Sequence, residues 1–142
     1  MQVDPRGQRF AAAVTTVVLI VVLVTGSWVL LAAQALVFAV GAVFGLRHAP
    51  YALLFKTLVR PRIGPPSELE DETPPRFAQG VGLVFAIVGA VAYGLGVTWL
   101  GLVATAFALL AAFLNAAFGL CLGCEMYLLI KRFTNANREV PT

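Results

Sequence analysis

The chain has 142 residues, of which 60% are hydrophobic and 12% are charged, whereas an ordinary soluble domain is about 45–50% apolar and about 25% charged. This composition excludes an ordinary soluble globular protein. The formal net charge is +3 and is not gathered into long basic blocks, so nothing indicates nucleic-acid binding. The length fits a single domain over residues 1–142, and two cysteines are too few for the disulfide framework of a small secreted protein.

Two long uncharged stretches, Phe10 to Leu46 and Phe77 to Cys124, predict membrane-spanning helices. A bilayer core of about 30 Å needs about 20 apolar helical residues, because lipid offers no partner for exposed backbone groups. Each stretch is long enough for two helices, with turns at Thr25-Gly26-Ser27 and around Gly94 to Thr98. We therefore predict four spans, at residues 10–26, 28–46, 77–94 and 99–121.

The basic residues predict how these spans are oriented. Short loops rich in Lys and Arg stay in the cytoplasm, and all ten basic residues precede the first span, follow the fourth, or lie between the second and third. Both termini and the central loop are therefore expected on the cytoplasmic side of a bacterial cytoplasmic membrane. Trp28 and Trp99 follow the two uncharged turns on the other side. Arg6 and Arg9 before an apolar run also fit a signal peptide, but that run continues into a second span without a clear cleavage site.

Short polar landmarks indicate an internal repeat. Arg9-Phe10-Ala11 before the first span recurs as Arg76-Phe77-Ala78 before the third, and Phe44-Gly45-Leu46 recurs as Phe118-Gly119-Leu120. Chance similarity between apolar segments is the alternative to a duplication. Each copy holds two spans, so the copies run in parallel about an axis along the membrane normal. The predicted fold is an all-α membrane protein whose four transmembrane helices form two tandem, parallel-related hairpins.

The segment between the two hairpins changes character along its length. At residues 50–60, apolar side chains recur at helical spacing with Lys56 and Arg60 off the stripe, which predicts an amphipathic helix at the membrane interface. Residues 61–75 are rich in Pro and acidic residues, a composition typical of an extended, solvated linker. Docking of a partner on the acidic run is the alternative for this linker.

Small and polar residues inside the spans predict how the helices pack. Small side chains allow close approach in lipid, and they recur at Gly41, Gly45, Ala104, Ala108, Ala112 and Ala116. We expect these faces to pack the four helices together, with homo-oligomerisation as the alternative. Gln34, Thr105 and Asn115 are expected to form interhelical hydrogen bonds. The spans contain no ionisable side chain, which argues against an ion pump or transporter and leaves a small-solute channel as a remote third reading.

Cys121-Leu122-Gly123-Cys124 is the one motif with evident chemistry. Two cysteines three residues apart share a helix face, and such pairs serve in dithiol exchange, persulfide carriage and metal binding. At the end of the fourth span, the helix dipole and Glu125 would both disfavour a thiolate, while Lys131 would favour one if the helix continues. A reducing cytoplasm favours two thiols over a standing disulfide. Two inert cysteines that fill space in a helix interface are the plain alternative.

The repeat places His48, the only histidine, at the same depth as the cysteine motif. A zinc cluster of His48, Cys121, Cys124 and Glu125 is therefore conceivable, but two cysteines alone do not complete a tetrahedral site, so we expect no metal. The glycines are dispersed rather than forming a phosphate-binding loop, so we also expect no cofactor.

Four segments carry a resemblance to a known family: Asp4-Pro5-Arg6-Gly7-Gln8-Arg9-Phe10-Ala11-Ala12, Leu58-Val59-Arg60-Pro61-Arg62, Pro75-Arg76-Phe77-Ala78-Gln79 and Phe118-Gly119-Leu120-Cys121-Leu122-Gly123-Cys124-Glu125. With these segments the chain resembles a bacterial membrane family catalogued as domain of unknown function 4395. The resemblance implies a four-helix integral membrane protein with no established activity, often encoded near thioredoxin-like and rhodanese-type proteins. The sequence looks unlike the VKOR-type oxidoreductases, because it lacks their second cysteine pair.

Two hypotheses follow for the function. In the first, Cys121 and Cys124 take part in thiol redox or sulfur transfer with a soluble thioredoxin-like or sulfurtransferase partner at the cytoplasmic face. Nearby basic residues would hold that partner close to anionic lipid. In the second, the protein is a structural or scaffold subunit of a larger membrane complex, and its cysteines are inert.

Overall fold

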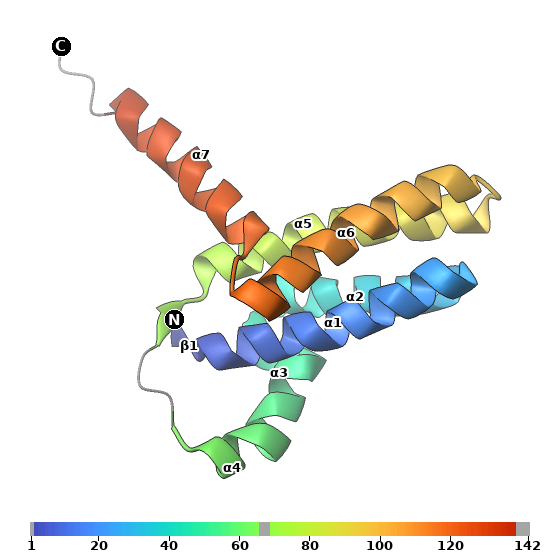
Figure 1. The fold of residues 1–142 in the computed structure, drawn as a ribbon. Coiled ribbons are helices and arrows are strands. Elements are labelled where there is room, and N and C mark those ends of the chain that lie inside the picture. Colours follow the sequence, from blue (N-terminus) through green and yellow to red (C-terminus); the bar gives the residue numbers. More distant parts are fainter. Residues whose placement is uncertain (1, 66–68, 139–142) are drawn as a thin grey trace.

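The computed structural model describes residues 2–65 and 69–138, and nearly all of them are helical, which confirms the predicted all-α class. Two short strands, β1 (Gln2–Val3) and β2 (Glu70–Asp71), pair in antiparallel fashion. The helical elements are α1 (Pro5–Thr25), α2 (Trp28–Phe44), a 3-10 turn (Leu46–His48), α3 (Pro50–Leu54), a π-helical segment (Phe55–Val59), α4 (Arg60–Ile63), α5 (Thr73–Gly94), α6 (Thr98–Phe118) and α7 (Leu122–Arg138) (Figure 1).

Three of these helices, α1, α5 and α6, are long and apolar enough to cross a membrane, and α2 is apolar but shorter at 17 residues. Their outer faces leave many large apolar side chains uncovered. So wide an exposed apolar surface requires contact with lipid and is that of a membrane protein. Among the most exposed are Val17, Val24, Leu36, Val84, Val91, Phe107 and Leu110.

Local signals place the first helix and its turn where the sequence predicts them. Asp4 Oδ1 accepts a hydrogen bond from the Arg6 N–H at 3.0 Å, which caps the start of α1. Burial acts to raise the pKa of Asp4, but hydrogen bonds from Arg6 and its positive charge lower it overall. Gly26 ends α1 with a φ of 66°, a value that glycine adopts without strain. Ser27 then caps α2 by accepting a hydrogen bond from the Leu30 N–H at 3.2 Å.

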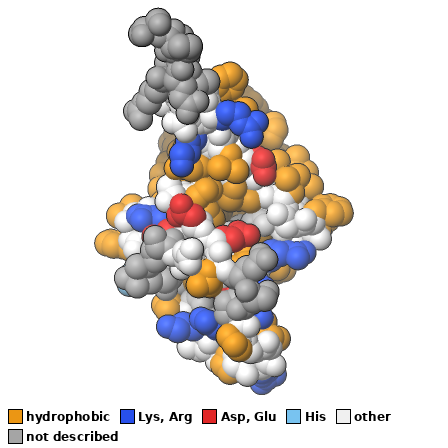
Figure 2. Space-filling view, turned by 90° about the vertical axis from the view of Figure 1, so that its left-hand side faces the viewer, with side chains coloured by type: hydrophobic (Ala, Val, Ile, Leu, Met, Phe, Trp, Pro, Cys, Tyr) orange, Lys and Arg blue, Asp and Glu red, His pale blue; other side chains and the backbone are white. Residues whose placement is uncertain are grey.

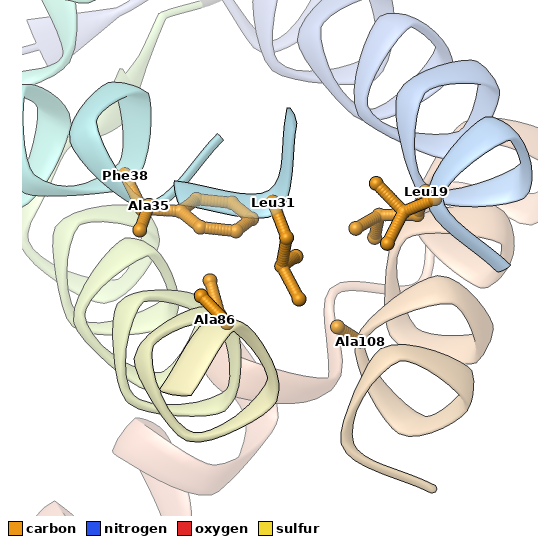
Figure 3. Packing of buried hydrophobic residues seen from close by; sticks show 8 residues of the cluster. Leu19, Leu31, Ala35, Phe38, Ala86 and Ala108 are labelled. Carbon is orange, nitrogen blue, oxygen red and sulfur yellow. The ribbon is translucent and has the colours of Figure 1, made fainter. Parts of the chain in front are cut away.

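The four apolar helices pack in a definite order: α2 lies along α5, α1 lies along α6, and α5 contacts α6. In the core, Leu31 of α2 points toward the space between Ala86 of α5 and Ala108 of α6 (Figure 3). The close approach of α2 to α5 depends on Gly89 of α5, since a Cβ there would lie 2.7 Å from Leu31 Cδ2. The expected ridge of small residues on α6 is buried at Ala104 and Ala108, and it becomes more open toward the end of the helix.

Arg76, in the first turn of α5, binds the end of α2. Its Nη2 donates hydrogen bonds to the carbonyl oxygens of Ala42 and Val43, each at 3.0 Å. Carbonyls in the last turn of a helix lack intrahelical partners, and the negative end of the helix dipole attracts a cation. Glu72, which is buried, also pairs with Arg76 at 3.5 Å. This arginine therefore joins α2 to α5 at the edge of the apolar region.

Arg9, in the first turns of α1, makes the equivalent contacts with the end of α6. Its Nη2 donates to the carbonyl oxygens of Ala116 and Ala117 at 3.2 and 3.4 Å. These residues stand in the same places before Phe118-Gly119-Leu120 as Ala42 and Val43 do before Phe44-Gly45-Leu46. The same interaction thus occurs twice, each time between the two predicted copies of the repeat: Arg9 of the first copy binds α6 of the second, and Arg76 of the second copy binds α2 of the first.

Other contacts also match between the two copies. The ring of Phe10, which follows Arg9, lies 5.7 Å from that of Phe55, and the ring of Phe77, which follows Arg76, lies 5.7 Å from that of Tyr127. Val3 of β1 pairs with Glu70 of β2, and each of these residues lies six positions before its arginine.

The segment between α2 and α5 is more ordered than the sequence suggests. Residues 50–63 form continuous helical structure, and Phe55 is buried against α1, where Gly7 leaves room for its ring. The stretch expected to be an extended linker, residues 61–75, begins in α4, contributes β2 and ends in α5. Asp71 accepts a hydrogen bond from the Thr73 N–H at 3.0 Å, which lowers the pKa of Asp71. The same hydrogen bond helps α5 to begin at Thr73, ahead of the predicted span at residues 77–94. Residues 66–68 lie outside the described part.

The polar residues inside the apolar helices have different surroundings. Gln34 is 1% exposed, and its Oε1 accepts a hydrogen bond from the Tyr51 hydroxyl at 2.7 Å, so the expected contact between helices is confirmed there. Burial also raises the pKa of Tyr51, which keeps this donor protonated. Thr105 Oγ1, by contrast, is buried without a hydrogen-bond partner among the described residues.

We predict that Arg76→Ala lowers the free energy of unfolding by about 1–3 kcal/mol, because it frees carbonyls at the end of α2 and leaves Glu72 buried without its ion pair. Arg9→Ala should cost less, since its hydrogen bonds are longer and more exposed. Thermal unfolding of the purified protein in detergent micelles measures both, with the exposed Arg62→Ala as control. Equal stability of all three variants would contradict the capping role.

Candidate functional site

The site forms around a break between α6 and α7. Gly119 adopts a φ of 69° directly after Phe118, and its N–H bonds the carbonyl of Asn115 at 2.9 Å, which ends α6. A new helix then begins at Leu122. The prediction that the fourth span extends to residue 121 is therefore wrong by three residues, because the glycine ends the helix before the cysteine motif.

Cys121 occupies the cap position in front of α7, and Cys124 lies in the first turn. The carbonyl of Cys121 accepts a hydrogen bond from the Glu125 N–H at 3.0 Å, and its Sγ accepts one from the Cys124 N–H at 3.1 Å. The sequence predicts both cysteines at the end of a helix, where the dipole opposes a thiolate; this placement is wrong. At a helix start, free N–H groups and the positive end of the dipole stabilise negative charge on sulfur.

The two sulfur atoms are joined by a disulfide bond. The Cα atoms of Cys121 and Cys124 lie 5.1 Å apart, within the separation that a disulfide spans. Both residues are half-buried. The sequence favours two free thiols. The structure instead has a disulfide, because the turn before α7 brings the two cysteine side chains together.

Gly123, between the two cysteines, lies tightly against the first turns of α5. A Cβ at this position would lie 2.5 Å from Cβ and 2.6 Å from Cα of Ala78. The Phe77–Tyr127 ring contact lies beside it. The motif is thus held against the start of α5, while the rest of α7 projects from the bundle (Figure 1).

The supporting residues named from the sequence lie at varying distances from this turn. Glu125 is exposed in the first turn of α7, and Lys131 is exposed farther along the same helix. His48 lies in the 3-10 turn after α2 and lines the same cavity as Cys121. Across residues 2–65 and 69–138, no group of three or more His, Cys, Asp and Glu side chains could hold a metal ion.

A cavity of about 860 Å³ beside the motif is a feature that the sequence analysis missed. It lies among α1, α2, α5, α6 and the helical segment at residues 46–60, and Cys121, Leu122 and Gly123 form part of its wall. Asn115, which the sequence predicts in a hydrogen bond between helices, lines this cavity together with Cys121. The break at Gly119 gives the two residues a different relative direction from the one that a continuous helix would give.

The end of the molecule that carries the motif also carries the basic side chains. Figure 2 shows this end, with Lys and Arg side chains around a surface that also holds acidic and apolar groups. The opposite turns carry no charge, and Trp28 and Trp99 are exposed there.

These features define an α-helical membrane protein with a cysteine pair at the start of a helix, at the basic end of the bundle. The chain belongs to the family described as Domain of unknown function (DUF4395), whose model matches residues 3–132. The resemblance noted from the sequence is thereby confirmed. Neither the curated proteins nor the solved structures contain a match to the chain.

We predict that Gly123→Ala destabilises the protein by about 1–3 kcal/mol, because the added methyl group overlaps the backbone of Ala78. The matched control is Gly80→Ala on α5, where a Cβ would meet open space; there the change should be neutral or slightly stabilising. Thermal unfolding in micelles compares the two. If both variants unfold at the wild-type temperature, the motif is not packed on α5 as described.

Proposed function

We propose that the protein is a membrane thiol–disulfide exchange or sulfur-transfer accessory whose reactive groups are Cys121 and Cys124. The observation that carries this proposal is the position of Cys121 in front of α7, where its Sγ accepts a hydrogen bond from the Cys124 N–H. A cysteine at a helix start is a better nucleophile, because the helix stabilises its thiolate. Partial exposure gives a partner access to the pair.

The exchange reaction proceeds through a mixed disulfide. In the oxidised protein, a partner thiolate attacks Cys121 Sγ, forms a mixed disulfide and releases the Cys124 thiolate. A second partner thiolate then attacks the partner sulfur of the mixed disulfide, forms a disulfide within the partner and releases the Cys121 thiolate. The partner loses two electrons and the Cys121–Cys124 pair gains two. Glu125 and Lys131 are charged groups on α7 that contact or orient the partner, and His48 lines the cavity beside Cys121.

The proposed partner is a soluble thioredoxin-like or sulfurtransferase protein at the cytoplasmic face of a bacterial membrane. Support comes from the concentration of basic side chains at this end (Figure 2), because cytoplasmic loops are enriched in Lys and Arg. We further propose that α2 crosses the membrane with α1, α5 and α6, as two hairpins related by a two-fold axis. Its 17 residues extend about 25 Å, and the matching contacts of Arg9 and Arg76 support a duplication.

A scaffold role is the second candidate, and the close packing of Gly123 on Ala78 favours it. In that case the disulfide braces the turn between α6 and α7, and the cysteines take no part in exchange. Serine at both cysteines would then leave assembly unchanged, while bulky residues at Ala108 or Ala112 would disrupt it.

We predict that Cys124→Ser traps a soluble partner on Cys121 as a mixed disulfide, because the resolving thiol is missing. Cys121→Ser should trap less of the partner, since the remaining Cys124 lies inside the first turn of α7 and not at the cap position. The double serine variant should trap nothing. Non-reducing gels and mass spectrometry of membranes measure the adducts. A membrane-impermeant thiol reagent should reach Cys121 in inside-out vesicles but not in intact cells.

The absence of trapped adducts would contradict the exchange function. If neither single variant forms an adduct under conditions that trap a known thioredoxin partner, the exchange function is wrong. Unchanged assembly of the double serine variant, together with failure of Ala108→Trp to assemble, would then support the scaffold role.

A further inference from the structure

The cavity beside Cys121 has the size and lining of a ligand site. Its volume of about 860 Å³ lies in the range of pockets that enclose a drug-sized molecule. Aromatic rings form part of its wall: Phe38 lines it, as do Phe85 and Phe107, whose ring centroids lie 6.2 Å apart.

Three amide side chains are among the residues that line this cavity. Gln8 comes from the first turn of α1, Gln79 from the second turn of α5 and Asn115 from the last turn of α6, and all three line the cavity. These helix ends lie at the same end of the bundle as Cys121. The Gln8 Nε2 is buried without a partner among the described residues. Buried amide donors of this kind require an acceptor, and carbonyl oxygens of a ligand would supply one.

The cysteine pair also requires an electron partner that the chain does not contain. Thiol exchange moves two electrons, and the two cysteines of this motif are the only ones in the sequence. No second cysteine pair can therefore pass the electrons onward. A two-electron carrier that dissolves in the bilayer would reach the pair through the cavity.

We propose that this cavity binds a lipid-soluble quinone, which oxidises the Cys121–Cys124 dithiol. The inference rests on the proposed thiol function and names its membrane-side co-reactant. The two thiols lose two electrons and two protons and form the disulfide; the quinone gains both and becomes the hydroquinone. The amides of Gln8, Gln79 and Asn115 donate hydrogen bonds to the quinone carbonyls. A phospholipid acyl chain would fill the apolar part of the cavity but leave the Gln8 Nε2 unpaired.

The test uses the full chain, reduced and freed of reductant, in nanodiscs of synthetic phosphatidylcholine without oxygen. The probe is a benzoquinone with a fully substituted ring and one isoprene unit, because thiols cannot alkylate such a ring. We expect one hydroquinone to form for each pair of alkylatable thiols lost. Gln79→Leu and Asn115→Leu should each raise the quinone concentration for half-maximal rate by about fivefold. Ala112→Phe, which fills the cavity, should abolish the reaction.

The matched control is Asn135→Leu, an amide replacement on the exposed surface of α7, which should leave the quinone reaction unchanged. Exchange with dithiothreitol separates the two claims. Suppose that all variants exchange normally with dithiothreitol. If none of them then reduces the quinone, or if the cavity variants reduce it like wild type, the quinone site is wrong and the thiol function stands. If the wild-type pair does not exchange with dithiothreitol, both are wrong. Bound phospholipid that the quinone does not displace also overturns the quinone site.

Discussion

The capping of two helix ends by arginine determines the arrangement of the bundle. Carbonyls in the last turn of α2 and of α6 have no partner inside their helices, and at the edge of an apolar region an unpaired carbonyl is costly. Arg76 supplies donors to the end of α2, and Arg9 supplies them to the end of α6. Each interaction places the start of one helix beside the end of another, and therefore sets the observed pairing of α2 with α5 and of α1 with α6.

The same end of the bundle holds the cysteine motif. Gly119 ends α6 beside the Arg9 guanidinium, and the chain starts again as α7. Cys121 then falls at a helix start, and Gly123 allows the turn to lie against α5 next to Arg76 and Phe77. The cysteine pair and the cavity beside it therefore both depend on how these helix ends meet.

The apolar runs and the turns between them were predictable from the sequence, because span length and turn chemistry are local properties. The first turn, the tryptophans after the turns and the interhelical hydrogen bond of Gln34 were also correct. The break at Gly119 was missed although the repeat contained its signal: Phe44-Gly45-Leu46 is followed by a new helix at Pro50, and Phe118-Gly119-Leu120 by a new helix at Leu122. The cavity could not be predicted, because it depends on how side chains from four helices pack in space.

The central claim is that the Cys121–Cys124 pair changes redox state in the cell. The most direct measurement is alkylation of intact cells with a mass-tagged thiol reagent, before and after oxidant or sulfide stress, with each single serine variant as reference. The account predicts a mixture of dithiol and disulfide whose ratio shifts reversibly with stress. A pair that stays in one state through every treatment would contradict the account and make the cysteines packing residues.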